Sequence, residues 1–139
     1  MPLPHWVIDT NVLVSAAITP NGVCDQVLQS AIAGMFVPAW DNKILSEYRE
    51  VLSRPKFKLS KTAVRALLEA LPSSGFHPAT PLAEIELPDL DDLPFVAAAL
   101  ATPDKTIITA NPSHYPESVM KKIGVEILSP RQALERLGR

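Results

Sequence analysis

The sequence predicts an α/β domain with a central, mainly parallel sheet. Short apolar segments that fit buried strands alternate with longer segments of helical spacing along the chain. Such alternation is typical of parallel sheets, because neighbouring parallel strands are joined by a crossover helix. The length of 139 residues, with 47% hydrophobic and 20% charged residues, fits one globular domain over residues 1–139.

The first strand and the first helix meet at an acidic residue. The apolar run at residues 5–8 predicts a buried strand that ends at Asp9. Helical spacing begins at residues 12–18, with Thr10 or Asn11 placed to cap the helix. Asp9 is therefore expected at the carboxyl end of a strand.

The next two elements are a helix and a brief strand. Residues 23–32 have apolar side chains at helical spacing, and Gly34 follows as a C-terminal cap. Residues 35–37 are expected as a strand that Pro38 stops.

Two further helices are predicted in the middle of the chain. Asp41 and Ser60 are suited to cap them, and a proline limits each at its other end. These helices are expected over residues 41–54 and 61–71.

A proline-rich stretch precedes the next helix. A short strand is expected around Phe76, followed by a loop with several prolines. A helix then starts at Asp91 or Asp92 and continues to Leu100, with Pro94 tolerated in its first turn.

The chain ends with two strands and a helix. Residues 106–109 are β-branched throughout, and residues 125–128 are mostly apolar, so both predict buried strands. The capping-box pattern Ser129–Gln132 opens a last helix over residues 131–137.

Composition excludes several classes of protein. No apolar run approaches the ~20 residues that a membrane span needs, and no signal peptide is expected at the N-terminus. Cys24 is the only cysteine, which excludes an internal disulfide and favours a cytoplasmic location. The histidines lack zinc-ligand spacing, and the glycines form no phosphate-binding loop.

Charge is distributed unevenly, although the formal net charge is only −2. Five basic residues and no acid lie from Arg54 to Arg65, and five acids and no base lie from Glu84 to Asp92. A basic run beside an acidic pocket suits a phosphodiester substrate. On the charge pattern alone, two solvated faces of opposite sign are the simpler explanation.

Polar side chains follow two of the expected strands. Asp9 ends the first strand, and Asn111 comes two residues after the strand at 106–109. Because ligands bind outside the carboxyl ends of parallel strands, both residues are expected at one crevice.

Additional acids come from two helices. Glu47 shares a helical row with Ile44 and therefore points toward the core side. Its partner is either a cation shared with other acids or, in an ordinary ion pair, Arg54 or Lys43.

A group of acids at positions 89, 91 and 92 precedes a helix, where capping accounts for one or two of them. When several carboxylates converge, a hard divalent cation is the usual way to offset their repulsion.

Four segments resemble, in order, the motifs of the PIN domain, a small nuclease fold that includes the toxins of many bacterial and archaeal toxin–antitoxin pairs. The segments are Val7–Leu13, Ser46–Phe57, Asp89–Leu100 and Ile107–Tyr115. The resemblance covers nearly the whole chain and implies a three-layer α/β/α fold.

The resemblance implies a Mg²⁺- or Mn²⁺-dependent endoribonuclease with one or two ions. Its catalytic residues would be Asp9, Glu47, Asp92 and Asn111, with Asp91 as a further candidate metal ligand. Thr10, Asn11, Arg54 and Lys56 would contact the RNA substrate or orient Asp9. The resemblance also implies a homodimer that a small antitoxin protein neutralises.

Two departures from the family pattern leave alternatives open. Asn111 replaces a carboxylate of many members, and Ala110 replaces the usual glycine. The first favours one ion over two and motivates an alternative, a catalytically silent PIN fold that binds RNA or a protein partner. A phosphatase-like hydrolase with Asp9 as nucleophile is a second alternative, although Asn11 stands where such enzymes have aspartate.

Overall fold

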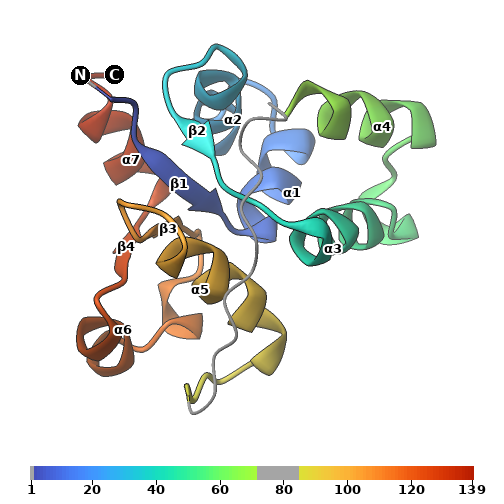
Figure 1. Ribbon diagram of the computed structural model, residues 1–139. Coiled ribbons are helices and arrows are strands. Elements are labelled where there is room, and N and C mark those ends of the chain that lie inside the picture. The colour runs from blue at the N-terminus through green and yellow to red at the C-terminus, as the bar shows by residue number, and fades with distance from the viewer. Residues whose placement is uncertain (1, 72–84) are drawn as a thin grey trace.

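A computed structural model describes residues 2–71 and 85–139, in which a four-stranded sheet is surrounded by helices (Figure 1). The strands are β1 (His5–Ile8), β2 (Val37–Pro38), β3 (Thr106–Ile108) and β4 (Glu126–Leu128). The helices are α1 (Thr10–Ile18), α2 (Val23–Ile32), α3 (Asn42–Leu52), α4 (Lys61–Ala70), α5 (Leu93–Leu100), α6 (Glu117–Ile123) and α7 (Pro130–Arg136). Short 3-10 helices lie at Pro55–Phe57 (η1), Leu90–Asp92 (η3) and Pro112–His114 (η4).

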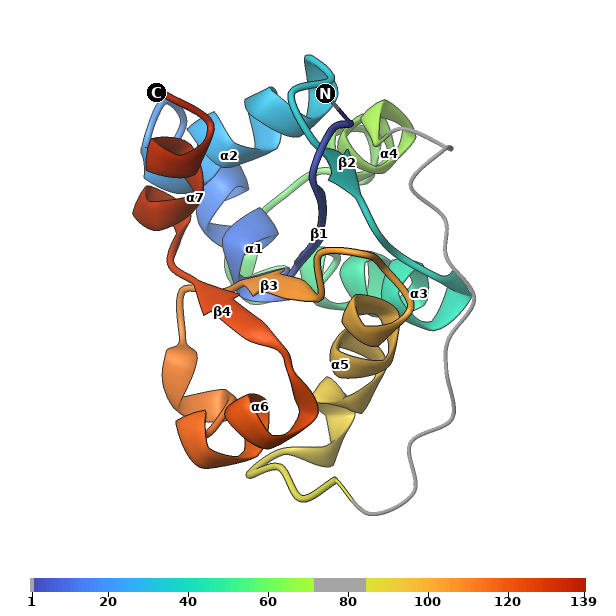
Figure 2. The same ribbon diagram turned by 60° about the vertical axis from the view of Figure 1, so that its left-hand side comes forward.

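The sheet has the strand order β2-β1-β3-β4, and every pair of neighbouring strands is parallel. Ile8 lies opposite Ile108, and Ile108 lies opposite Leu128, so three strands end side by side. The predicted parallel sheet is therefore confirmed. Figure 2 shows β4 at one edge, between α6 and α7 in the chain.

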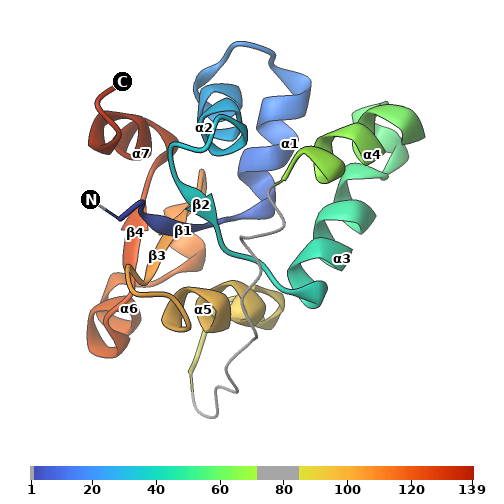
Figure 3. The same cartoon turned by 45° about the horizontal axis from the view of Figure 1, so that its top comes forward.

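Helices cover both faces of this sheet. Figure 3 shows α1, α2 and α7 on one side, α5 and α6 on the other, and α3 with α4 beside α1. Val7, Ile107 and Ile108 are fully buried between these layers. Ala98 and Ala99 of α5 are also fully buried, and their small side chains let the helix approach β1 and β3 closely. The three-layer α/β/α architecture is confirmed.

Most helix boundaries agree with the signals in the sequence. Asp41 and Ser60 accept hydrogen bonds as the N-caps of α3 and α4, and Ser129 and Gln132 form the capping box of α7. The expected cap at Thr10 or Asn11 is wrong, because α1 begins directly at Thr10 and no side chain caps it. The chain thus passes from β1 into α1 with only Asp9 between them.

Two elements differ from expectation. The helix α6 was not expected, since it has only seven residues and follows Pro116 without a side-chain cap. The strand β2 contains Pro38, which was expected to stop it. Proline is acceptable there because β2 is an edge strand.

The strand expected around Phe76 lies outside the described residues. Within the described part of the chain, the search for a helix that could cross a membrane found none of sufficient length and apolarity.

Candidate active site

The candidate site forms where β1 and β3 end. Asp9 directly follows β1, and its backbone N–H donates to the carbonyl oxygen of Ile108 at 2.9 Å. Thr109 directly follows β3. The register of the two strands therefore places Asp9 and Thr109 side by side, as expected for the carboxyl edge of a parallel sheet.

The Asp9 carboxylate is almost fully buried, with 4% of the residue exposed. Its Oδ2 accepts hydrogen bonds from the hydroxyls of Thr109 at 2.9 Å and Tyr115 at 3.0 Å, and from the amide of Asn11 at 3.3 Å. Burial raises the pKa of Asp9, and the hydroxyls of Thr109 and Tyr115 and the backbone of Thr10 oppose this rise. Hydrogen-bond donors from three segments of the chain therefore hold this buried carboxylate in place.

Glu47 reaches the same site from α3. Ile44, Tyr48 and Leu52 form the buried row of this helix, and the Tyr48 hydroxyl donates to the carbonyl oxygen of Ile8 at 2.5 Å. This contact ties α3 to the end of β1. One residue before Tyr48, the Oε2 of Glu47 accepts a hydrogen bond from the hydroxyl of Thr10. Thr10 therefore links the second acid to the chain beside Asp9.

The pKa of Glu47 is raised, first by burial and then by the negative charges of Asp9, Asp91 and Asp89. An ion pair between Glu47 and Arg54 was one expected alternative. It is wrong, because Arg54 instead pairs with Glu50 at 2.9 Å. Glu47 is thus influenced more by other acids than by a base.

Asp92 is the third buried acid, at the end of η3 where α5 begins. Its Oδ2 lies 3.0 Å from Nδ1 of His114. Burial and the negative charge of Asp9 raise the pKa of Asp92 to about 6, although His114 opposes the rise. The influence of Asp9 means that the two acids share one electrostatic environment.

Apart from His114 beside Asp92, the three acids have no basic side chain paired with them among the described residues. Within residues 2–71 and 85–139, no lysine or arginine forms an ion pair with Asp9, Glu47 or Asp92. Such a concentration of buried carboxylates is unfavourable unless protons or a cation neutralise it.

The other predicted site residues have different surroundings. Asn111 lies near Asp9 through its backbone N–H, which donates to the Thr109 hydroxyl at 3.0 Å. Its side-chain oxygen instead accepts from Ser113 at 2.7 Å. Asp91 is exposed, and its backbone N–H donates to the carboxylate of Asp89 at 2.9 Å.

The departure at Ala110 has a local explanation. The side-chain oxygen of Asn11 accepts from the backbone N–H of Ala110 at 3.0 Å, while its amide nitrogen donates to Asp9 and Thr109. Asn11 therefore joins the segments that follow β1 and β3. Alanine is acceptable at position 110 because its φ is not positive, so glycine is not required there.

Arg54 and Lys56 are not joined to the acids by any hydrogen bond or ion pair between described residues. Arg54 bonds to Glu50 through two nitrogens, and the Nζ of Lys56 lies 5.1 Å from the centre of the Phe57 ring. Both side chains belong to an exposed basic surface around η1.

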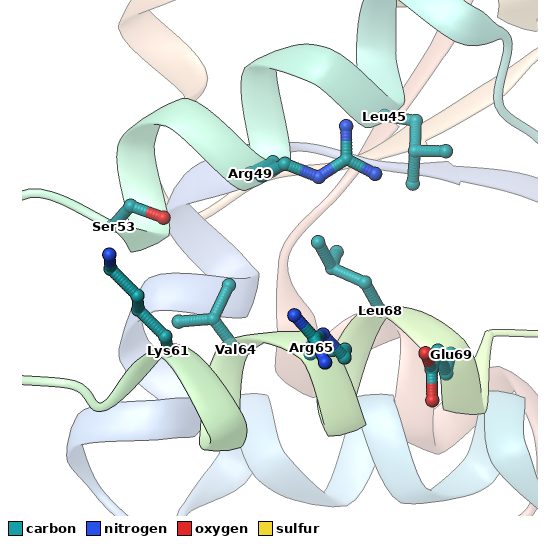
Figure 4. Close-up of a pocket in the computed structure, with 8 residues that line it drawn as sticks. All are labelled: Leu45, Arg49, Ser53, Lys61, Val64, Arg65, Leu68 and Glu69. Atoms are coloured by element: carbon teal, nitrogen blue, oxygen red, sulfur yellow. The ribbon is translucent and has the colours of Figure 1, made fainter.

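A groove of about 480 Å³ adjoins this basic surface, between α3 and α4 (Figure 4). It has an apolar floor with basic side chains beside it. Its lining residues are Leu45, Arg49, Ser53, Lys61, Val64, Arg65, Leu68 and Glu69. Leu45 and Arg49 lie two residues on either side of Glu47, so they project from the opposite side of α3, and the groove is separate from the acidic site.

Four contact residues of the site were not singled out from the sequence. Thr109 and Tyr115 bond to Asp9, His114 contacts Asp92, and Tyr48 fixes the end of β1. Thr109 could have been found as the residue after a buried strand. The contacts of Tyr48, His114 and Tyr115 depend on tertiary packing, and no spacing rule predicts them.

The chemistry of these donors fits a hard divalent cation, because carboxylate oxygens are the preferred ligands of Mg²⁺ and Mn²⁺. The distances between these side chains are a separate criterion. In the part of the chain that the structure describes, no three His, Cys, Asp or Glu side chains already form a group that could hold a metal ion. The predicted ligand set therefore stays a prediction.

A family model described as the PIN domain matches residues 5–113, a range that includes Asp9, Glu47, Asp92 and Asn111. No curated protein matches the chain.

Proposed function

Since this chain belongs to the PIN-domain family, whose members are generally metal-dependent nucleases, we propose that it is a Mg²⁺- or Mn²⁺-dependent endoribonuclease. The observation that carries the proposal is a set of three buried or half-buried acids. One follows β1, one ends η3 and one lies within α3, and no lysine or arginine of the described residues pairs with any of them. Such a set is unfavourable in a protein interior without a cation.

Asp9, Glu47 and Asp92 would hold the ion, and Asp91 would be an additional ligand on the exposed side. A divalent ion bound there would lower the pKa of a water nucleophile and stabilise charge on the phosphoryl oxygens. One ion is the expected number, because Asn111 contributes no charge where many relatives have a carboxylate.

The chain's own residues would orient this chemistry. Thr10 holds one oxygen of Glu47, and Asn11 holds both Asp9 and the loop after β3. The Asn111 amide would orient the attacking water or a phosphate oxygen. Arg54 and Lys56 would attract the phosphates of RNA on either side of the cleaved bond.

Cleavage of RNA by purified protein tests this proposal. Wild type with Mn²⁺ should cut a single-stranded RNA, and EDTA should abolish the cut. Asp9→Asn should reduce the rate at least 100-fold, since a neutral amide is a poorer ligand and leaves the cation less firmly held. Asp104→Asn, an acid outside the site, is the matched control with full activity. Equal rates for wild type and Asp9→Asn would refute the assignment.

The biological role we propose is that of a cytoplasmic toxin, active as a homodimer and neutralised by a small antitoxin protein. The motif resemblance of residues 46–57 to proteins of this class supports it. Induced expression should arrest growth, and Asp9→Asn should relieve the arrest. A short neighbouring gene whose product restores growth would identify the antitoxin. Growth unaffected by the wild-type protein would contradict the role.

A catalytically silent RNA-binding protein is the second candidate. The neutral Asn111, whose side-chain oxygen already accepts a hydrogen bond from Ser113, favours it. RNA binding without cleavage at any Mg²⁺ or Mn²⁺ concentration would support this candidate over the nuclease. A phosphoryl group trapped on Asp9 would instead point to the phosphatase-like alternative.

A further inference from the structure

We propose that His114 and Tyr115 are positioning residues that hold Asp9 and Asp92, so that one oxygen of each carboxylate is left to bind the metal ion. This inference rests on the proposed metal dependence. The two residues are consecutive in sequence, and neither is one of the acids proposed to bind the ion.

Tyr115 acts on Asp9. It is 2% exposed, and its hydroxyl donates to Oδ2 of Asp9 at 3.0 Å. Thr109 and Asn11 donate to this same oxygen. No side chain among the described residues donates to Oδ1 of Asp9. The three donors therefore fix Oδ2, while Oδ1 receives no hydrogen bond from a side chain.

His114 has the corresponding relation to Asp92. Its Nδ1 lies 3.0 Å from Oδ2 of Asp92, whose side chain is only 10% exposed. An ionised carboxylate can only accept hydrogen bonds, so Nδ1 carries the proton when Asp92 is ionised. In the described chain, Oδ1 of Asp92 likewise receives no side-chain hydrogen bond.

The backbone around η4 fixes both side chains together. The N–H of Asn111 donates to the Thr109 hydroxyl at 3.0 Å, and the N–H of Tyr115 donates to the carbonyl oxygen of Pro112 at 3.0 Å. These bonds connect the turn to Thr109, which itself holds Asp9. A single turn thus contacts the acid that follows β1 and the acid that ends η3, which are 83 positions apart in sequence.

This arrangement has a direct consequence for metal binding. Residues that hydrogen-bond to metal ligands fix ligand orientation, and their loss typically lowers metal affinity about 10–100-fold. Removing the Tyr115 hydroxyl or the His114 ring should therefore weaken metal binding although neither residue is proposed to touch the ion.

The test measures Mn²⁺ affinity directly, by calorimetry or by electron paramagnetic resonance, without RNA. Tyr115→Phe and His114→Ala should weaken Mn²⁺ binding about tenfold or more. Thr102→Val is the matched control, because Thr102 is also buried but its hydroxyl donates to the Ala99 carbonyl, at the end of α5 opposite Asp92. This control should bind Mn²⁺ as wild type does. His114→Asn, which can place an amide N–H near the position of Nδ1, should restore part of the affinity. Circular dichroism confirms that each variant is folded.

Two results would overturn the inference: unchanged affinity in Tyr115→Phe, or an equal loss in Thr102→Val and Tyr115→Phe. Wild type that binds no Mn²⁺ at millimolar concentration would also overturn it. Cleavage assays on the same samples separate this inference from the proposed function. Tight Mn²⁺ binding without RNA cleavage contradicts only the nuclease. Mn²⁺-dependent cleavage with unaltered affinity in both variants contradicts only the positioning role.

Discussion

At the scale of single residues, the ionised forms of three acids in the site destabilise the folded protein. Asp9, Glu47 and Asp92 each have a raised pKa, and burial is the largest cause in every case. Their ionised forms are therefore less stable in the folded protein than in the unfolded chain. Residues that weaken a fold in this way are commonly kept for their chemistry.

Stability without metal should consequently fall as the pH rises from about 4 to about 6. The folded pKa of Asp92, about 6, lies above its ordinary value of 3.8, so the folded state binds more protons in this window. The expected loss from Asp92 is about 3 kcal/mol over the whole pH window, since the pKa rises by about two units and one unit corresponds to about 1.4 kcal/mol. Urea unfolding in EDTA at pH 4.5 and pH 7 measures it.

The matched variant for this pH dependence is Asp92→Asn, which cannot ionise. It should lose less stability than wild type over the same pH range, and it should be more stable than wild type at pH 7 in EDTA. Identical pH dependence in the two proteins would contradict the raised pKa of Asp92.

A divalent cation should reverse this loss. Binding to the folded state alone stabilises it by about 2.7 kcal/mol at a concentration 100 times the dissociation constant. Because metal ligands must be ionised, Mn²⁺ should raise the melting temperature more at pH 7 than at pH 5. Thermal melts of wild type and Asp9→Asn with Ca²⁺-free Mn²⁺ buffers test this, and an equal shift in both proteins would argue against a site at Asp9.

The acids of the site could be predicted from the sequence because each one has a recognisable place in or beside a predicted element. Asp9 ends an apolar strand, Glu47 lies in an amphipathic helical row, and Asp92 precedes a helix. The roles of Tyr115 and His114 could not be predicted in this way. Their partners lie 106 and 22 positions away, and only the folded chain makes them neighbours.

At the scale of elements, local signals determined most of the helices, and tertiary context determined the exceptions. The caps of α3, α4 and α7 follow from Ser, Asp and Gln side chains that bond to nearby backbone. The helix α6 lacks such a cap, and it ends at Gly124, which has a φ of +80°. Its formation depends on packing of Met120 and Val119 against the core, which periodicity over seven residues does not reveal.

The strand β3 should be a major source of stability, because it is central in the sheet and fully buried. Ile107→Ala should destabilise the protein by about 2–5 kcal/mol through lost burial and a cavity. Ile18→Ala removes the same atoms from a side chain that is 51% exposed, and should change stability by less than about 1 kcal/mol. Denaturant unfolding compares them, and similar losses would contradict the observed burial.

At the scale of the whole molecule, charge is segregated. Seven of the 13 lysines and arginines fall between Lys43 and Arg65, accompanied by only Glu47 and Glu50 as acids. This segment covers α3, η1 and the start of α4, while the chain as a whole has a net charge of −2. An anionic polymer would be attracted toward this region despite the overall negative charge.

Replacing Arg54 and Lys56 together by alanine should weaken binding to single-stranded RNA. If each contacts one phosphate, the slope of log affinity against log salt should fall in magnitude by about 1.4. The control is the double alanine variant of Lys121 and Lys122, which changes net charge equally on α6. Fluorescence titrations at several salt concentrations measure the slopes. Equal effects in the two double variants would show that net charge, rather than this surface, governs binding.

The outer strand β4 has a consequence for how two copies of this chain would associate. Two nitrogens of Arg136 donate to the two carboxylate oxygens of Glu126 at 2.6 and 3.1 Å, so an exposed ion pair lies at this edge strand of the sheet. Charged groups at such an edge discourage a second chain from extending the sheet strand by strand. Extension of the sheet by a second copy along β4 is therefore disfavoured, so two copies that associated at this side would make contact through other surfaces.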